Sequence, residues 1–257
     1  MPYFKSNHRK LFYREQGQGP LLLILPGSTA SSACHQGELN YFSAHFHAVS
    51  LDFCGTGKSD KSQHWPEDWW TRGAHDAAAL VEHLGEETCV VMGTSGGGVV
   101  ALLMAQLYPQ RVQAVVADSC TSRFPPEEIP AVVSARENPQ PEQIAFWEFA
   151  HGSDWEQVVK ADSSLLLRFA ERGGQWLNGQ LSTIQCPVLF TASLGDELLF
   201  NVGEEVLGMS QQIKCGHVFM TREGTHPLMW SCPEDFRCAC DAFLDWVISG
   251  EEQPVIC

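Results

Sequence analysis

Residues 90–100 read VVMGTSGGGVV, in which an apolar run leads into G-T-S-G-G, centred on Ser95, and then into a second apolar run. This is a G-x-S-x-G pattern between a predicted strand and a predicted helix, where a sharp turn exposes the serine hydroxyl. The strained turn needs small residues two positions before and after the serine, and both are glycine here. The pattern therefore predicts that Ser95 is a nucleophile. The alternative is a glycine-rich strand–helix junction without chemistry.

A serine hydroxyl is a weak nucleophile, so it needs a base that accepts its proton and an acid that orients the base. Asp196 lies in a loop after the apolar run CPVLFTAS, and His226 lies in a loop after the next run, GHVFMT. We expect these two residues to be the acid and the base. His217 is the rival base, but it is expected to begin a strand, away from the loop. Asp118, at the end of VVAD, is the rival acid; it could instead contact a substrate or cap a turn.

The candidate residues lie at the ends of short apolar runs that alternate with helical patterns. Such alternation is typical of a mostly parallel sheet with helices on both faces. The strands are predicted at 21–25, 48–52, 88–92, 112–118, 187–192 and 213–220, after a hairpin over 3–15. Helices are predicted over 68–85, 96–108 and 233–249. The length of 257 residues suits one large α/β domain with an insertion.

The alternation stops between residues 122 and 185, which contain helical patterns but no convincing strand. We interpret this segment as a helical cap that divides the core into 1–121 and 186–257. Its aromatic side chains could line a lid over a pocket, and Trp147 is the candidate substrate contact among them. The alternative is that most of these aromatic side chains pack the insertion onto the core.

The segments LILPGS, DFCGTGKSD, GTSGG, TASLGDELL and GTHPLMW together resemble the α/β-hydrolase superfamily over nearly the whole chain. The resemblance implies an eight-stranded, mostly parallel sheet with a helical cap after the sixth strand. It also implies the chain order nucleophile, acid, base, which Ser95, Asp196 and His226 satisfy. For the oxyanion it implies backbone N–H donors at Gly96 and, in the LPGS loop, at Ser28. The Ser28 hydroxyl could assist or could cap a turn.

The nucleophile type narrows the reaction that the resemblance implies. Serine at this position disfavours the dehalogenase and epoxide hydrolase branches, which use aspartate, and favours acyl transfer to water. The loop LPGSTA lacks the HGGG and HGGPG runs of other branches, and its LPG is similar to that of small lidded carboxylesterases and aminoacyl-ester hydrolases. We therefore expect hydrolysis of a small or medium carboxylic ester through an acyl-enzyme.

Other hypotheses stay open on sequence alone. An aminoacyl-ester or amide hydrolase would use acidic residues to bind an ammonium group, and the candidates are Asp118, Glu127, Glu128, Glu142 and Glu148. The alternative is that such carboxylates only solubilise the surface. A carbon–carbon bond hydrolase of the same fold would use the same triad. A non-catalytic ligand-binding protein of this fold could also retain it.

The composition limits the partners. The formal net charge is −15, with 31 acidic and 16 basic residues, and this excess repels phosphate backbones and anionic lipids. We expect a small-molecule acyl substrate, no nucleic acid and no membrane, with a monomer and a homodimer both open. The residues before 21 contain no apolar signal segment, which predicts a cytoplasmic protein. Several of the ten cysteines lie in apolar runs, as expected of buried, reduced thiols.

The segment LDFCGTGKSD, residues 51–60, contains GTGKS, which looks like the end of a phosphate-binding P-loop. The P-loop requires glycine five positions before Gly57, where this chain has Asp52. The segment matches instead the D-x-x-G-x-G-x-S turn of the hydrolase superfamily, ending at Ser59. The pairs CAC and HFH lack a second pair at metal-site spacing. We therefore expect neither a cofactor nor a metal.

Overall fold

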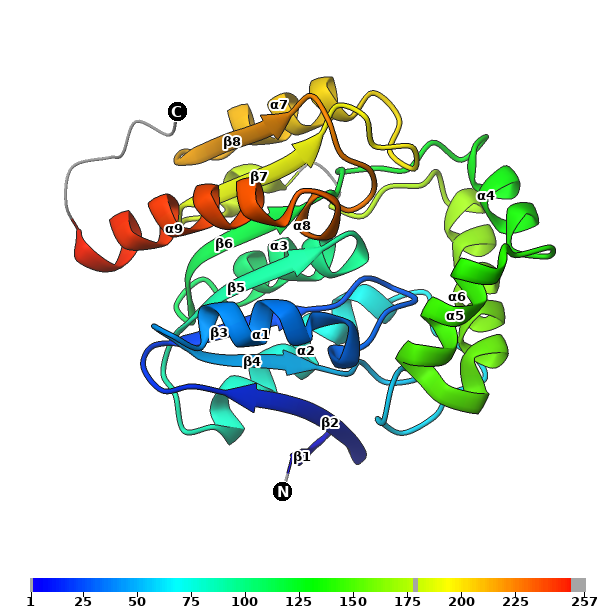
Figure 1. The fold of residues 1–257 in the computed structure, drawn as a ribbon, viewed down its shortest axis with the longest axis horizontal. Helices are drawn as coiled ribbons and strands as arrows, with labels where there is room; N and C mark the ends of the chain where they lie inside the picture. Colours follow the sequence, from blue (N-terminus) through cyan, green and yellow to red (C-terminus); the bar gives the residue numbers. More distant parts are fainter. Residues whose placement is uncertain (1, 178–179, 251–257) are drawn as a thin grey trace.

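The computed structural model describes residues 2–177 and 180–250. Its centre is an eight-stranded sheet in the order β1-β2-β4-β3-β5-β6-β7-β8 (Figure 1). The strands β1, β2 and β4 pair antiparallel, and all other neighbours pair parallel. The bounds are β1 Tyr3–Ser6, β2 Arg9–Gln16, β3 Leu21–Leu25, β4 His47–Leu51, β5 Cys89–Thr94, β6 Val112–Asp118, β7 Val188–Ser193 and β8 Gly216–Thr221.

Both faces of the sheet are covered by helices, because its central strands are apolar on both sides. In β3, Leu22 and Ile24 join one core cluster while Leu21, Leu23 and Leu25 join the other, as the two-residue period of a strand requires. Helices α2 (Trp69–His83), α3 (Gly96–Leu107) and α7 (Val202–Gln212) pack on one face. Helices α1 (Gln36–Phe42), α8 (Leu228–Ser231) and α9 (Pro233–Ser249) pack on the other (Figure 1).

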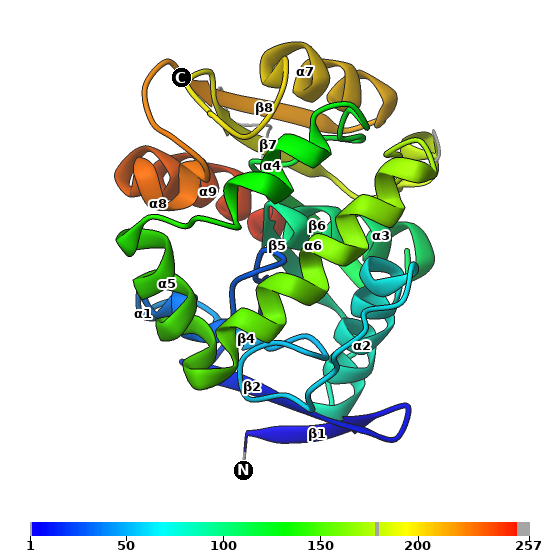
Figure 2. The same ribbon diagram turned by 90° about the vertical axis from the view of Figure 1, so that its right-hand side faces the viewer.

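Three helices follow β6 before the chain returns to the sheet at β7. They are α4 (Ile129–Ala135), α5 (Pro141–His151) and α6 (Trp155–Glu171), and they lie within the segment where the sequence predicts an insertion. Figures 1 and 2 show them beside the carboxyl ends of the parallel strands. This is the edge at which parallel sheets hold their ligands. We call these three helices the cap.

The predicted fold class is confirmed, and all six predicted strands are present: β3 and β6 have the predicted bounds, and the ends of the other four differ by one to three residues. The predicted helices correspond to α2, α3 and α9. Three helices that cover the sheet, α1, α7 and the short α8, have no counterpart in the sequence prediction. In α7, Gly203 and Gly208 lower the helix propensity, and packing of Val206 and Met209 against the core stabilises it instead.

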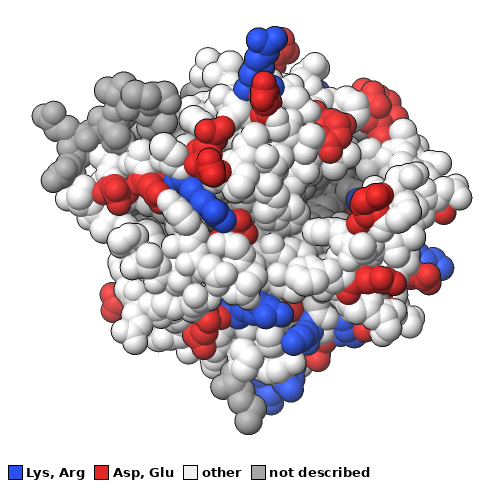
Figure 3. Space-filling model, in the orientation of Figure 1, with Lys and Arg blue, Asp and Glu red and all other residues white. Residues whose placement is uncertain are grey.

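The outside of the molecule carries mixed charge. On the face seen in Figure 3, acidic side chains are scattered, and several basic ones gather towards its lower edge. The nine cysteines among the described residues are all free thiols, and Cys89 and Cys240 are fully buried. No helix within residues 2–177 and 180–250 is long and apolar enough to cross a membrane.

Candidate active site

Ser95 lies between β5 and α3 with φ 54° and ψ −125°, a backbone conformation that residues other than glycine rarely adopt. The two glycines around it are required by the space available. A Cβ atom on Gly93 would lie 2.1 Å from the carbonyl oxygen of Gly97, and a Cβ atom on Gly97 would lie 2.1 Å from that of Leu25. The tight turn expected from the sequence is therefore present, and it presents Ser95 at the carboxyl end of the sheet.

His226 and Asp196 come together as the sequence predicts. His226 Nδ1 lies 2.8 Å from Asp196 Oδ2; the Asp196 side chain is fully buried, and the His226 side chain is 9% exposed. Asp196 Oδ1 accepts the backbone N–H groups of Leu198 and Leu199 at 2.9 and 3.0 Å. One carboxylate oxygen is thus held by the loop, and the other is left to orient the imidazole so that Nε2 is the free ring nitrogen.

A second carboxylate also holds His226, and the sequence analysis does not identify it. Glu197 Oε2 accepts the backbone N–H of His226 at 3.0 Å. Two adjacent acids therefore fix the ring and the main chain of the same residue. The rival base His217 lies within β8, and its ring packs against Trp246. This position keeps His217 away from the loop that carries His226.

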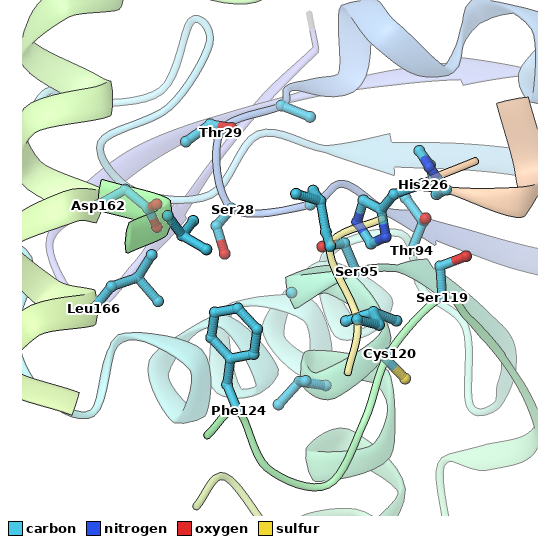
Figure 4. Close-up of a pocket in the computed structure, with 18 of the residues that line it drawn as sticks. Ser28, Thr29, Thr94, Ser95, Ser119, Cys120, Phe124, Asp162, Leu166 and His226 are labelled. Carbon is cyan, nitrogen blue, oxygen red and sulfur yellow. The ribbon is translucent and has the colours of Figure 1, made fainter. Parts of the chain in front are cut away.

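Ser95 and His226 line a cavity of about 680 Å³ beneath the cap (Figure 4). Gly96 and Ser28 line it as well, and a Cβ atom on Gly96 would lie 3.3 Å from the backbone nitrogen of Ser28. The two backbone N–H groups named from the sequence are thus neighbours beside Ser95. Trp147 also lines the cavity and stacks on Trp155 with their ring centres 5.6 Å apart.

Much of the cavity wall is apolar. The core contributes Trp70, Val99 and Leu199, the segment between β6 and α4 contributes Phe124, and the cap contributes Val132, Phe146, Trp147 and Leu166. Apolar walls with a few polar groups are typical of small-molecule sites. Among the described residues, no cluster of His, Cys, Asp or Glu has the arrangement of a metal site.

Asp118 is fully buried behind the cavity and is not among the residues that line it. Its carboxylate accepts hydrogen bonds from the hydroxyls of Thr94 and Thr191, each at 2.7 Å, and from the N–H of Met229 at 3.3 Å. Burial raises the pKa of Asp118 to about 6, against the opposing effect of the two threonine hydroxyls and of nearby His226. This position favours a structural role over contact with a substrate.

The turn containing GTGKS is built around Asp52. Its carboxylate accepts the backbone N–H groups of Ser32 and Lys58, each at 2.7 Å. A Cβ atom on Gly57, which has φ +49°, would lie 2.0 Å from Asp52 Oδ2. The turn thus wraps a carboxylate, where a P-loop would wrap a phosphate. This matches the structural role that the superfamily motif implies.

His151 connects this turn to the cap and to the loop that carries Ser28. The N–H of Gly57 donates to His151 Nδ1 at 3.0 Å, and His151 Nε2 lies 3.0 Å from the carbonyl oxygen of Thr29. Since Nδ1 accepts, Nε2 carries the proton and donates it to Thr29. Burial lowers the pKa of His151 to about 4, so the ring is neutral. The sequence analysis does not identify His151, because its partners are 94 and 122 residues away.

A family model of the alpha/beta hydrolase fold matches residues 20–185. The match covers more than half of the chain, and the chain therefore belongs to the α/β-hydrolase fold family. This confirms the resemblance stated from the sequence.

Two curated proteins show the range of its relatives. A 2-(acetamidomethylene)succinate hydrolase of Mesorhizobium japonicum is 33% identical over 121 residues, which are 46% of this chain and 42% of that protein. The chain therefore matches less than half the length of that relative. The human protein named Serine hydrolase BPHL is 23% identical over 257 residues, covering 93% of this chain and 84% of its own length.

Solved structures share the fold over nearly the whole chain. The esterase EaEST from Exiguobacterium antarcticum has a TM-score of 0.78 at 17% identity, covering 96% of this chain and 98% of its own. A thermophilic esterase from Thermogutta terrifontis has a TM-score of 0.76 at 21% identity, covering 96% and 97%. At such identities the likeness extends to the fold alone.

Proposed function

We propose that this protein is a serine hydrolase that cleaves a small or medium carboxylic ester through an acyl-enzyme intermediate. One observation carries the proposal. Ser95, at the strained turn, and His226, which is hydrogen-bonded to Asp196, line the same cavity, although the three residues lie in separate loops. An imidazole oriented by a carboxylate and facing the same cavity as a serine hydroxyl is the arrangement that acyl transfer needs.

In the proposed first step, His226 Nε2 accepts the proton of the Ser95 hydroxyl as the oxygen attacks the substrate carbonyl carbon. The imidazole becomes positively charged at this stage. Asp196, held by Leu198 and Leu199, stabilises that charge and keeps Nδ1 protonated. The hydrogen bond from the backbone N–H of His226 to Glu197 keeps the main chain of His226 in place during the proton transfer.

The tetrahedral intermediate carries a negative charge on the former carbonyl oxygen. We propose that the N–H groups of Gly96 and Ser28 stabilise it, because both line the cavity beside Ser95. Gly96 opens α3, so the helix N-terminus adds to the stabilisation. Loss of one such donor typically lowers turnover about 10²–10³-fold.

The intermediate then collapses to the acyl-enzyme. His226 donates its proton to the leaving alcohol, and afterwards it activates a water molecule that releases the acyl group and regenerates Ser95. The apolar side chains Phe124, Trp147 and Leu166 would surround the acyl chain. We assign Asp118 a positioning role in this cycle, because it holds Thr94, next to Ser95, and Met229, close to His226.

Amide hydrolysis is the second candidate function. The supporting observation is the Mesorhizobium japonicum relative, whose name describes a hydrolase of an acetamido compound. The same triad serves ester and amide cleavage, since both proceed through a tetrahedral intermediate. The two candidates differ in the leaving group that His226 must protonate.

The test is a panel of activated esters, thioesters and amides of increasing acyl length, with Ser95→Ala as the control. We expect the esters to have the highest kcat/KM and the Ser95→Ala variant to lose hydrolysis almost completely. A folded Ser95→Ala variant that kept full activity would refute the proposal. Wild-type protein whose Ser95 did not react with a fluorophosphonate probe would favour the non-catalytic, ligand-binding alternative.

A further inference from the structure

One carboxylate of the cap has an unfilled bonding position at the cavity. Asp162, on α6, has a side chain that is 0% exposed, and its Oδ2 atom lies 2.6 Å from Arg136 Nη1. No described residue donates a hydrogen bond to its buried Oδ1 atom. Asp162 nevertheless lines the cavity, and Figure 4 shows it projecting from α6 with Leu166, one helical turn later, on the same side.

A half-satisfied carboxylate is costly in such a place. An ionised carboxylate only accepts hydrogen bonds, and a buried acceptor without a donor loses the water contacts that it had in the unfolded chain. A purely structural ion pair would be expected to fill both oxygens. The cavity-lining residues of α4, Ala131, Val132 and Ala135, and Leu166, one turn further along α6, are apolar and offer no side-chain donor. The missing donor can therefore come from a molecule bound in the cavity.

Arg136 supplies the complementary group beside this acceptor. Its Nη1 atom serves Asp162 and also lies 3.1 Å from Ser163 Oγ, while the other guanidinium nitrogens have no hydrogen bond to a described residue. The Arg136 side chain is 17% exposed and lines the cavity. Because the guanidinium has five N–H donors, it can hold Asp162 and still donate to a ligand. A donor and an acceptor thus stand side by side in an apolar wall.

We propose that Arg136 and Asp162 form the distal end of the substrate pocket and select acyl groups that carry a carboxamide. The amide N–H would donate to Asp162 Oδ1, and the amide oxygen would accept from Arg136. A neutral amide fits better than an ammonium group, because Arg136 already balances the charge of Asp162. This inference rests on the proposed ester hydrolysis at Ser95, and it assigns both residues to substrate selection.

Two series of activated esters test the proposal on wild-type protein. The first ends in a primary carboxamide and the second in a methyl ketone, across a range of acyl lengths. The two end groups have nearly the same shape and the same acceptor, but only the amide has N–H donors. At the length that reaches Asp162, we expect kcat/KM for the amide to exceed that for the ketone by at least about tenfold, because an unpaired buried acceptor penalises the ketone.

The isosteric variant Asp162→Asn tests the assignment to Asp162. The amide oxygen of the new asparagine can keep the contact with Arg136. In that orientation its NH₂ group, a hydrogen-bond donor, replaces Oδ1 and faces the ligand. We expect the amide-to-ketone ratio to fall to about one or to reverse. The ratio is the readout because it cancels any general loss of activity. The control is Glu156→Gln, an exposed residue of the same helix, which should keep the wild-type ratio.

The outcomes separate this inference from the proposed function. Equal kcat/KM values for amide and ketone at every length would overturn the inference and leave a structural ion pair only. Preference for an amine-terminated ester over the amide would also overturn it. Hydrolysis that survives in Ser95→Ala would instead refute the proposed function. If thermal unfolding showed that Asp162→Asn does not fold, the comparison of amide and ketone esters on wild-type protein would still test the inference.

Discussion

Replacing His151 by phenylalanine should change how the stability of the protein depends on pH. The neutral imidazole joins Gly57 N–H to the carbonyl of Thr29, and burial lowers its pKa from 6.5 to about 4. Since one pKa unit corresponds to about 1.4 kcal/mol, this difference contributes roughly 3 kcal/mol to the free energy of unfolding. Lys61 lowers the pKa further, whereas the hydrogen bond to Thr29 and the charge of Asp154 raise it.

The sign follows from proton binding. Below pH 6.5 the unfolded chain protonates His151 while the folded protein does not, so stability falls as the pH falls. The contribution is complete above pH 6.5 and is lost once the pH passes about 4. Asp118 has the opposite effect, because its folded pKa is raised from 3.8 to about 6, and its contribution is lost as the pH rises through that range. The effects of His151 and Asp118 therefore oppose each other in the pH dependence of the wild-type stability, and neither can be read from that curve alone.

The assay is a comparison of wild type and His151→Phe by urea unfolding at a series of pH values between 4 and 7. The effect of Asp118 is common to both proteins, so the difference between them isolates His151. We expect wild type to be the more stable at pH 7, with an advantage that shrinks by roughly 3 kcal/mol on acidification. An advantage that stayed constant with pH would refute the assignment of a neutral, buried imidazole at this position.

Three further predictions concern the triad, the turn at Ser95 and, as a comparison for the turn, helix α7. Asp196→Asn should lower kcat about 10⁴-fold with little change in the unfolding midpoint, because the amide no longer favours the required tautomer of His226. Esterase kinetics measure this effect, and a loss in kcat below tenfold would contradict the prediction. Gly97→Ala should destabilise the fold by roughly 3 kcal/mol in urea unfolding, because its Cβ would lie 2.1 Å from the carbonyl of Leu25. Gly208, on α7, has open space where a Cβ atom would lie, so Gly208→Ala should instead stabilise the fold by about 0.5–1 kcal/mol. Equal effects of Gly97→Ala and Gly208→Ala on stability would contradict the steric argument.

The sequence by itself determined the sheet, the turn at Ser95 and the order of the candidate triad. These features depend on neighbours along the chain. An apolar run such as LLLIL specifies a strand buried on both faces. Glycine is required at positions 93 and 97, around Ser95, because a side chain there would clash with the backbone. Asp196 and His226 could be named because each follows a strand, and parallel strands end at one edge of the sheet.

The tertiary structure alone decided which polar groups face one another across the fold. Glu197 holds the main chain of His226 from 29 residues away, and His151 joins loops from the first quarter of the chain to the cap. Asp118 lies behind the cavity, whereas Asp162 lies on its wall, although both are acids near apolar residues in the sequence. Such differences arise because burial and hydrogen bonding depend on how elements that are distant in the sequence pack together. Local sequence patterns do not predict that packing.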